Sequence, residues 1–139
     1  MKISTKGRYG LTIMIALGKH YGEGPVSLKT IATENKLSEH YLEQLAAPLR
    51  NASLVKSIRG AKGGYMLASP PSEITAGDII RTLEGPITPV EGIEEEEPAK
   101  QQLWLRIRDA VRDVLDTTTL EDLCTHGDDE SPDPYMFYI

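Results

Sequence analysis

The chain has 139 residues, about the length of one domain and enough to bury a core without disulfides or metals. It is 40% hydrophobic and 26% charged, and no uninterrupted apolar run approaches the roughly 20 residues that cross a bilayer. A single cysteine excludes an internal disulfide, and the first ten residues lack the apolar segment of a secretory signal, so we expect a cytoplasmic protein.

The net charge of −6 hides an asymmetry between the two halves of the chain. Residues 1–68 contain ten Lys or Arg and four Asp or Glu, a net charge of +6. Residues 69–139 contain five Lys or Arg and seventeen Asp or Glu, a net charge of −12. The basic half favours an anionic partner such as DNA, RNA or an acidic membrane surface. A solvated surface whose asymmetry has no function is the alternative interpretation.

The first fifty residues predict three helices, each preceded by a serine that can cap it. Ser4 precedes an apolar stripe of helical spacing over residues 5–20, and Ser27 precedes a shorter stripe from residue 28. After a tight turn at residues 35–37, Ser38 opens a third helix with Leu42, Leu45, Ala46 and Leu49 on its inner face. Pro48 is expected to kink or divide this third helix.

Two strand-like runs follow, at residues 54–58 and 65–68, joined by the glycine-rich sequence RGAKGG. Three helices and a β-hairpin predict a winged helix-turn-helix, so the expected fold class is mainly α with a small β-hairpin. Thr75 then caps a short helix that ends at Gly85-Pro86. We therefore expect the DNA-binding domain to span residues 1–85.

The remainder predicts an acidic linker, a long helix and a tail. Residues 86–97 are irregular and end in four consecutive glutamates, and Pro98 can open a helix that continues to about residue 118. One side of that helix is apolar, with Leu103, Trp104, Ile107, Val111 and Val114. Few other elements remain to cover it, so we expect a second copy to do so and residues 98–127 to form a dimerisation region.

A short helix capped by Thr119 and Asp122 is predicted to end at Gly127. Residues 128–139 then form an acidic tail, expected to be flexible, that ends in apolar and aromatic residues.

The second and third helices have the dimensions of a helix-turn-helix, whose second helix lies in the major groove of DNA. The outward residues at the start of the third helix are Ser38, Glu39, His40, Tyr41, Glu43 and Gln44. Gln44 can read adenine, and Glu43 can accept a hydrogen bond from cytosine N4. An ordinary surface helix is the alternative, because two glutamates without such a role would repel DNA.

The hairpin tip is the second candidate DNA contact. Arg59 and Lys62 alternate there with Gly60 and Gly63, a combination that suits a narrow minor groove. The tip does not match a nucleotide-binding P-loop, because Lys62 precedes glycines and a strand. Phosphate contacts are expected from Lys6, Arg8, Lys29 and Arg50.

The sequence gives little support to a catalytic or metal site. His20, His40 and His126 share no ligand spacing with Cys124. Cys124 lies on a predicted inner helix face, which is typical of a small buried apolar residue; a redox-sensing thiol is the alternative. No nucleophile elbow or zinc-protease pattern occurs. We expect no enzyme activity, no metal and no cofactor.

Four sequences in order, MKISTKGRYGL, LSEHYLEQL, RGAKGGY and TAGDIIRTLEGP, resemble the Rrf2 family of bacterial winged-helix transcription regulators over about residues 1–90. The resemblance implies a homodimeric repressor on partly palindromic promoter DNA, with residues 38–44 in the major groove and 59–64 in the minor groove. It also implies that the long helix crosses to the partner subunit. Relatives that hold iron–sulfur clusters carry three cysteines before that helix, whereas this linker has none, so no such cluster is expected.

The later segments LWLRIRDAVRDVLDTTTLEDL and YMFYI resemble family members that repress genes of cysteine and sulfur metabolism. This resemblance implies a complex with O-acetylserine thiol-lyase (cysteine synthase), governed by O-acetylserine. A free carboxylate preceded by aromatic residues suits capture in a pocket of the partner. We therefore expect Phe137, Tyr138 and Ile139 to bind in a pocket of the thiol-lyase. Packing of the tail on the dimer is the alternative. The rival functions are a protein-interaction adaptor and a redox-sensing repressor that acts through Cys124.

Overall fold

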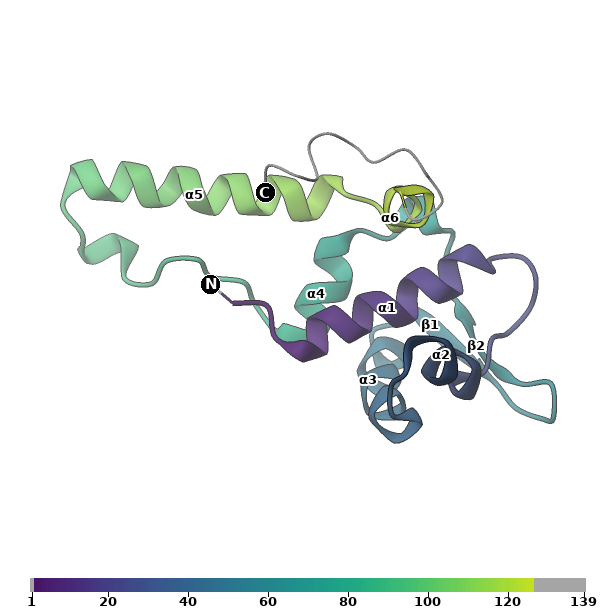
Figure 1. Cartoon of the computed structure of the whole chain (residues 1–139). Coiled ribbons are helices and arrows are strands. Elements are labelled where there is room, and N and C mark those ends of the chain that lie inside the picture. The colour runs from purple at the N-terminus through teal and green to yellow at the C-terminus, as the bar shows by residue number, and fades with distance from the viewer. Residues whose placement is uncertain (1, 127–139) are drawn as a thin grey trace.

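A computed structural model describes residues 2–126, which form a helical body with one β-hairpin at its edge and a long helix that extends away from this body (Figure 1). In chain order the elements are α1 (Thr5–Lys19), α2 (Leu28–Asn35), α3 (Glu39–Asn51), β1 (Val55–Ile58), β2 (Gly64–Leu67), η1 (Pro71–Glu73), α4 (Ala76–Glu84), η2 (Ile93–Glu95), α5 (Pro98–Thr117) and α6 (Leu120–His126). The predicted fold class, mainly α with a small β-hairpin, is confirmed.

The predicted helix starts are confirmed by their caps. A hydroxyl accepts a hydrogen bond from a backbone N–H two or three residues further on at Ser4, Ser27, Ser38, Thr75 and Thr119. Asp78 and Asp122 complete the exchange, because each carboxylate accepts from the backbone N–H of its capping threonine at 3.0 Å. These reciprocal pairs hold the first turns of α4 and α6.

Pro48 does not divide the third helix, which was one of the two effects predicted for it. α3 continues through Pro48 to Asn51. Proline removes one hydrogen bond of the helix. The buried side chains of Leu45, Ala46 and Leu49 anchor the turns on both sides of it to the core, and this apolar burial keeps the helix together.

The β-hairpin is antiparallel, with Val55 opposite Leu67 and Ile58 opposite Gly64. Val55 and Leu67 are 2% and 3% exposed and close one side of the core. Tyr65 also pairs with Val26, and the two residues exchange backbone hydrogen bonds of 2.8 Å. The hairpin is thereby fixed to the segment that leads into α2.

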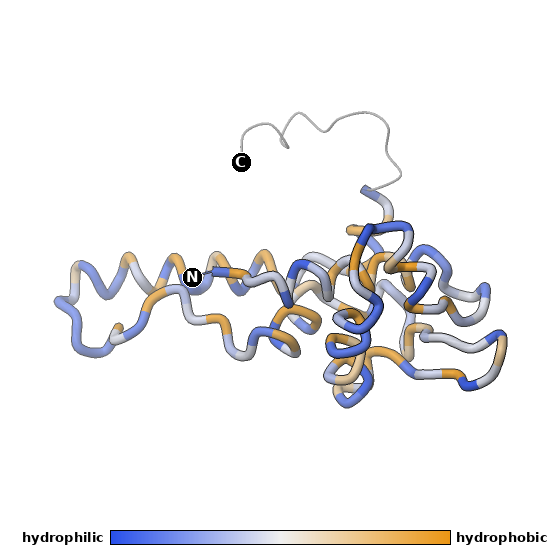
Figure 2. The backbone as a smooth tube through the Cα atoms, turned by 60° about the horizontal axis from the view of Figure 1, so that its bottom comes forward, coloured by the Kyte–Doolittle hydropathy of each residue, from blue (hydrophilic) through white to orange (hydrophobic). Residues whose placement is uncertain are grey.

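One apolar core joins α1, α2, α3, the hairpin, α4 and α6. Its largest fully buried side chains are Ile13, Met14, Leu17, Ile31, Leu42, Leu49, Ile74, Ile79 and Leu120. Figure 2 shows the hydrophobic segments concentrated in this body and recurring along α5. Leu120 belongs to α6, so the chain returns to the winged-helix body after α5.

The long helix α5 is attached to the body near its C-terminal end and to the linker near its N-terminal end. Leu115 is the buried residue of α5 and packs with Ala76 and Ile80 of α4. Arg81 of α4 donates from Nη1 to Oδ1 of Asp116 at 2.6 Å. At the other end of α5, Gln101 donates from Nε2 to the carbonyl of Ile93 at 3.0 Å. These contacts at both ends therefore fix the direction of α5 relative to the body.

Candidate nucleic-acid interface

The helix-turn-helix is built by α2, a short turn and α3. Lys36 adopts left-handed backbone angles, φ 55° and ψ 45°, and ends α2. The N–H of Leu37 then donates to the carbonyl of Ala32 at 2.8 Å, which closes the turn. The tight turn predicted at residues 35–37 is confirmed, and the start of α3 that follows it is exposed.

The exposed side of α3 carries most of the predicted base-reading residues. Leu42 and Leu45 face the core, at 0% and 3% exposed. The exposed set consists of Ser38, Glu39, His40, Glu43 and Gln44. The amide of Gln44 and Nε2 of His40 share a hydrogen bond of 3.3 Å, which limits the orientations of both side chains.

Tyr41 differs from the other members of this set because it is half-buried. Its ring meets that of Tyr9 edge to face, with centroids 5.9 Å apart and planes at 88°. Sequence spacing placed Tyr41 on the outward side, but the ring also joins α3 to α1. It therefore packs the motif together at the border of the exposed surface.

The hairpin tip forms the wing. Gly60 has a φ of 113°, and a Cβ at Gly63 would clash with the carbonyl of Ile58, so this turn needs glycines. Arg59 and Lys62 are both exposed. Neither has an ion-pair partner within residues 2–126, which leaves both cations available for an anionic ligand.

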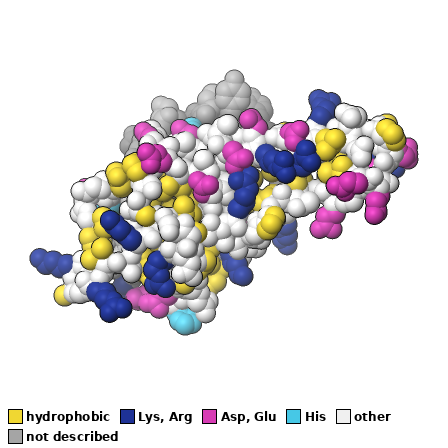
Figure 3. All heavy atoms as spheres, turned by 180° about the vertical axis from the view of Figure 1, so that it is seen from behind, with side chains coloured by type: hydrophobic (Ala, Val, Ile, Leu, Met, Phe, Trp, Pro, Cys, Tyr) yellow, Lys and Arg dark blue, Asp and Glu magenta, His cyan; other side chains and the backbone are white. Residues whose placement is uncertain are grey.

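The predicted phosphate contacts are exposed as well: Lys6 and Arg8 on α1, Lys29 on α2, and Arg50 on α3. In the part of the chain that the structure describes, none of the four forms an ion pair. Figure 3 shows Lys and Arg side chains at the wing end of the molecule and Asp and Glu clustered at the far end of α5.

Lys56 is a candidate DNA contact that the sequence reasoning missed. It lies on β1, is exposed and precedes the wing tip. The signal was present in the charge pattern, because no Asp or Glu occurs between Glu43 and Glu73, whereas Arg50, Lys56, Arg59 and Lys62 all lie in that interval. The wing therefore has a locally positive potential although the whole chain is acidic.

The apolar side of α5 is the candidate dimer contact. Leu103, Ile107 and Val114 are 47%, 37% and 62% exposed, and Trp104 and Val111 are half-buried. A cavity of about 320 Å³ lies between α5 and the N-terminal segment, lined by Ile3, Ile87, Ala110, Val111, Val114 and Leu115. The lining is wholly apolar, so the face offers both exposed apolar side chains and a depression that can accept one.

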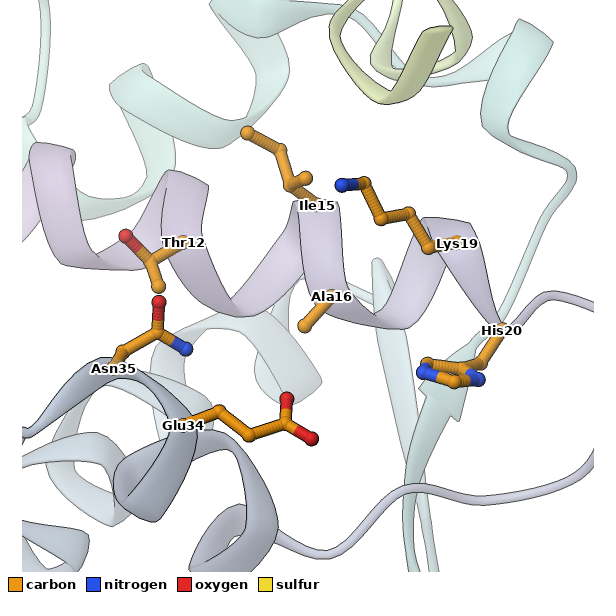
Figure 4. Close-up of a pocket in the computed structure, with 7 residues that line it drawn as sticks. All are labelled: Thr12, Ile15, Ala16, Lys19, His20, Glu34 and Asn35. Carbon is orange, nitrogen blue, oxygen red and sulfur yellow. The ribbon is translucent and has the colours of Figure 1, made fainter. Parts of the chain in front are cut away.

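A second cavity, of about 300 Å³, lies between α1 and α2 (Figure 4). It is lined by one face of α1 and the last turn of α2: Thr12, Ile15, Ala16, Lys19, His20, Glu34 and Asn35. None of these is among the predicted DNA-binding residues. No three His, Cys, Asp or Glu side chains gather as metal ligands among residues 2–126, in this cavity or elsewhere.

Some predicted features lie outside the described residues. These are the three partner-binding residues Phe137, Tyr138 and Ile139, together with Gly127 as a helix end. Within residues 2–126, no helix combines the length and the apolar character needed to span a membrane.

A helix-turn-helix with an exposed polar second helix, together with a wing that carries exposed cations, defines a winged-helix transcription regulator. Comparison with known proteins then gives the family. The family model for Rrf2, described as an iron-dependent transcriptional regulator, matches residues 3–126. The chain is 73% identical over 139 residues to the HTH-type transcriptional regulator CymR of Bacillus subtilis (strain 168), covering 100% of both. The chain belongs to the Rrf2 family, and the predicted resemblance is confirmed.

Solved structures agree with this assignment. The structure described as CymR (YrzC), the global cysteine regulator of B. subtilis, matches with a TM-score of 0.87 and 74% identity, covering 91% of this chain and 98% of that chain. Staphylococcus aureus CymR matches with a TM-score of 0.76 and 63% identity, covering 94% and 99%. Because the close relatives are transcriptional regulators, the protein is not an enzyme.

The residues of the linker do not fit the iron–sulfur cluster that some relatives hold. Residues 86–97 of the linker contain glutamates but neither cysteine nor histidine. Cys124 lies on α6, where its Sγ donates to the carbonyl of Ile15 on α1 at 3.6 Å. Clusters are held by several thiolates together, and the linker supplies none.

Proposed function

We propose that the protein is a homodimeric, sequence-specific DNA-binding repressor of genes for cysteine and sulfur metabolism, acting in the cytoplasm. The observation that carries the proposal is the exposed polar start of α3 together with the exposed wing cations Arg59 and Lys62, which form no ion pair within residues 2–126. The regulatory target is supported by the similarity to a relative described as the global cysteine regulator of B. subtilis.

In this proposal residues 1–85 bind DNA, and the start of α3 enters the major groove. Gln44 and Glu43 read base edges, and their exposure together with the burial of Leu42 and Leu45 supports that role. Arg59 and Lys62 enter the minor groove from the wing, with the backbone of Gly60 and Gly63 close to the phosphates. Lys6, Arg8, Lys29 and Arg50 bind phosphates and set the register.

Residues 98–127 form the dimerisation region in this proposal, connected through the linker at 86–97. The exposed side chains of Leu103, Ile107 and Val114 support it, because an apolar face of this kind is stable in water when a partner covers it. A two-fold dimer presents the same surface on both subunits. Two copies of α3 then meet two half-sites, which accounts for a partly palindromic operator.

We further propose that the C-terminal residues Phe137, Tyr138 and Ile139 bind O-acetylserine thiol-lyase, with O-acetylserine competing for the same pocket. Support comes from the sequence: an acidic segment is followed by the aromatic and apolar residues YMFYI, which suit binding in a pocket of a partner protein. Full-strength binding of the enzyme by a protein that lacks the last four residues would contradict this docking.

The redox alternative through Cys124 finds less support. The thiol is half-buried between α6 and α1, and a Cβ at Gly18 would lie 2.6 Å from its sulfur. A thiol enclosed in this way is less accessible to an oxidant than a thiol on the surface. A Cys124→Ser variant that still responds to oxidants as the parent does would remove the redox alternative.

The test is a titration of the full-length protein with promoter fragments of cysteine-biosynthesis genes and with a scrambled fragment, at two salt concentrations. The expected result is selective, salt-dependent binding that the thiol-lyase strengthens and O-acetylserine relieves. If the protein binds the promoter selectively and the thiol-lyase does not change this binding, the proposed repressor is supported and the proposed complex with the enzyme is contradicted. Absence of binding to every DNA would favour the protein-interaction adaptor.

A further inference from the structure

The outer face of the wing carries an isoleucine that the protein leaves uncovered. Side chains alternate along β1, so Val55 and Ser57 lie on one face of the hairpin and Lys56 and Ile58 on the other. Val55 is buried, whereas Ile58 is 41% exposed. Ile58 is therefore a large apolar side chain on the face that points away from the core.

The fold itself prevents the hairpin from covering this side chain. Ile58 is paired with Gly64, which has no side chain to lay against it. Gly64 has a φ of 152°, and a Cβ there would clash with the carbonyl of Val26. Because the Val26–Tyr65 bridge needs this close approach, a side chain at position 64 is excluded and Ile58 stays open.

Every charged residue near Ile58 in the wing sequence is cationic. Arg59 follows it in sequence, Lys56 shares its face and Lys62 lies at the tip. All three cations are exposed, and within residues 2–126 none forms an ion pair. A surface that is apolar at its centre and basic at its edge matches the minor groove of DNA, where deoxyribose walls lie between rows of phosphates.

We infer that Ile58 is a DNA-contacting residue that packs against the deoxyribose wall of the minor groove while Arg59 enters the groove beside it. The inference rests on the proposed function and adds an apolar contact to the wing. Isoleucine is among the side chains that proteins place in minor grooves. The contact depends on groove width, so Ile58 favours the narrow groove of A·T-rich sequence.

The test compares Ile58→Ala with the parent and with Ser57→Ala, which changes the opposite face of the same strand. We expect Ile58→Ala to weaken promoter binding about tenfold, the loss that corresponds to uncovering an isoleucine side chain. The slope of log K against log salt should stay unchanged, because no charge is removed. Ser57→Ala should bind as the parent does, and all three proteins should melt at the same temperature because both side chains are exposed.

The possible results separate the inference from the proposed function. If the parent binds its promoter selectively and Ile58→Ala binds equally well, the inference is overturned and the repressor stands. A reduced salt slope in Ile58→Ala would also overturn it, because the contact would then be electrostatic. Loss of thiol-lyase binding with intact DNA binding would make this face a protein contact. If the parent binds no DNA selectively, both proposals fail.

Discussion

The side chain of Glu84 caps the helix that begins after Ser4, 80 residues earlier in the chain. Its Oε1 accepts hydrogen bonds from the backbone N–H groups of Ser4 and Gly7, each at 2.9 Å, and also from the hydroxyl of Ser4. A carboxylate at this position interacts favourably with the positive end of the α1 dipole. The end of α4 thus holds the start of the helix on which Lys6 and Arg8 lie.

Replacing Glu84 by alanine should destabilise the winged-helix body. The N–H groups of Ser4 and Gly7 would lose their acceptor, and a lost cap of this kind costs about 1 to 2 kcal/mol. Urea unfolding followed by circular dichroism measures the change. Glu73→Ala is the control, because Glu73 is exposed on η1 and its side chain forms no ion pair within residues 2–126. Equal midpoints for the two variants would contradict the capping role.

The same contact predicts a pH dependence. The hydrogen bond from the Ser4 hydroxyl, with those from the backbone, lowers the pKa of Glu84 below its ordinary value of 4.5. A carboxyl whose pKa is lower in the folded state stabilises the protein above its unfolded pKa and ceases to do so as pH falls through the folded pKa. The stability difference between the parent and Glu84→Gln should therefore be full at neutral pH and shrink in acid. Unfolding at pH 7 and at pH 3 tests this, and a difference that grows in acid would contradict it.

The ion pair between Arg81 and Asp116 predicts how the end of α5 is attached to α4. The 2.6 Å hydrogen bond raises the pKa of Arg81 and lowers that of Asp116, so both groups stay charged. Arg81→Ala should let the end of α5 move relative to α4, with faster amide exchange in residues 111–117. Arg106→Ala is the matched control, because Arg106 lies exposed on α5 and makes no ion pair within residues 2–126. Unchanged exchange in Arg81→Ala would show that the contact of Leu115 with α4 suffices.

Sequence reasoning succeeded where the physical cause is local. Ser27 and Ser38 cap the helices that follow them because a hydroxyl reaches an N–H three residues away, which a sequence pattern can show. The contact of Glu84 with Ser4 joins residues that no periodicity relates, so the sequence contains no sign of it. The partial burial of Tyr41 has a similar cause, because it depends on the ring of Tyr9, which lies on another helix.

The proposed dimer face predicts the effect of a charge at Val114, which is 62% exposed and lines the apolar cavity. Val114→Glu should give a monomer in sedimentation experiments, because a carboxylate buried in an apolar contact has no partner. Promoter affinity should fall about a hundredfold, because two half-sites would no longer be held by one molecule. Asp113→Ala, at an exposed neighbouring position, is the control. A Val114→Glu variant that remains dimeric would move the interface away from this face.

Loss of a wing contact and loss of a phosphate contact should have different effects on the specificity and the salt dependence of DNA binding. Arg59→Ala should weaken specific promoter binding by about 1 to 3 kcal/mol. The difference in affinity between promoter and scrambled DNA should become smaller. Lys29→Ala should weaken both DNAs equally and lower the salt slope by about one, because a phosphate contact carries no sequence information. Titrations of both variants at two salt concentrations distinguish these effects. If Arg59→Ala binds its promoter as tightly as the parent, the wing does not enter the minor groove, and specificity must then come from the α3 residues Glu43 and Gln44.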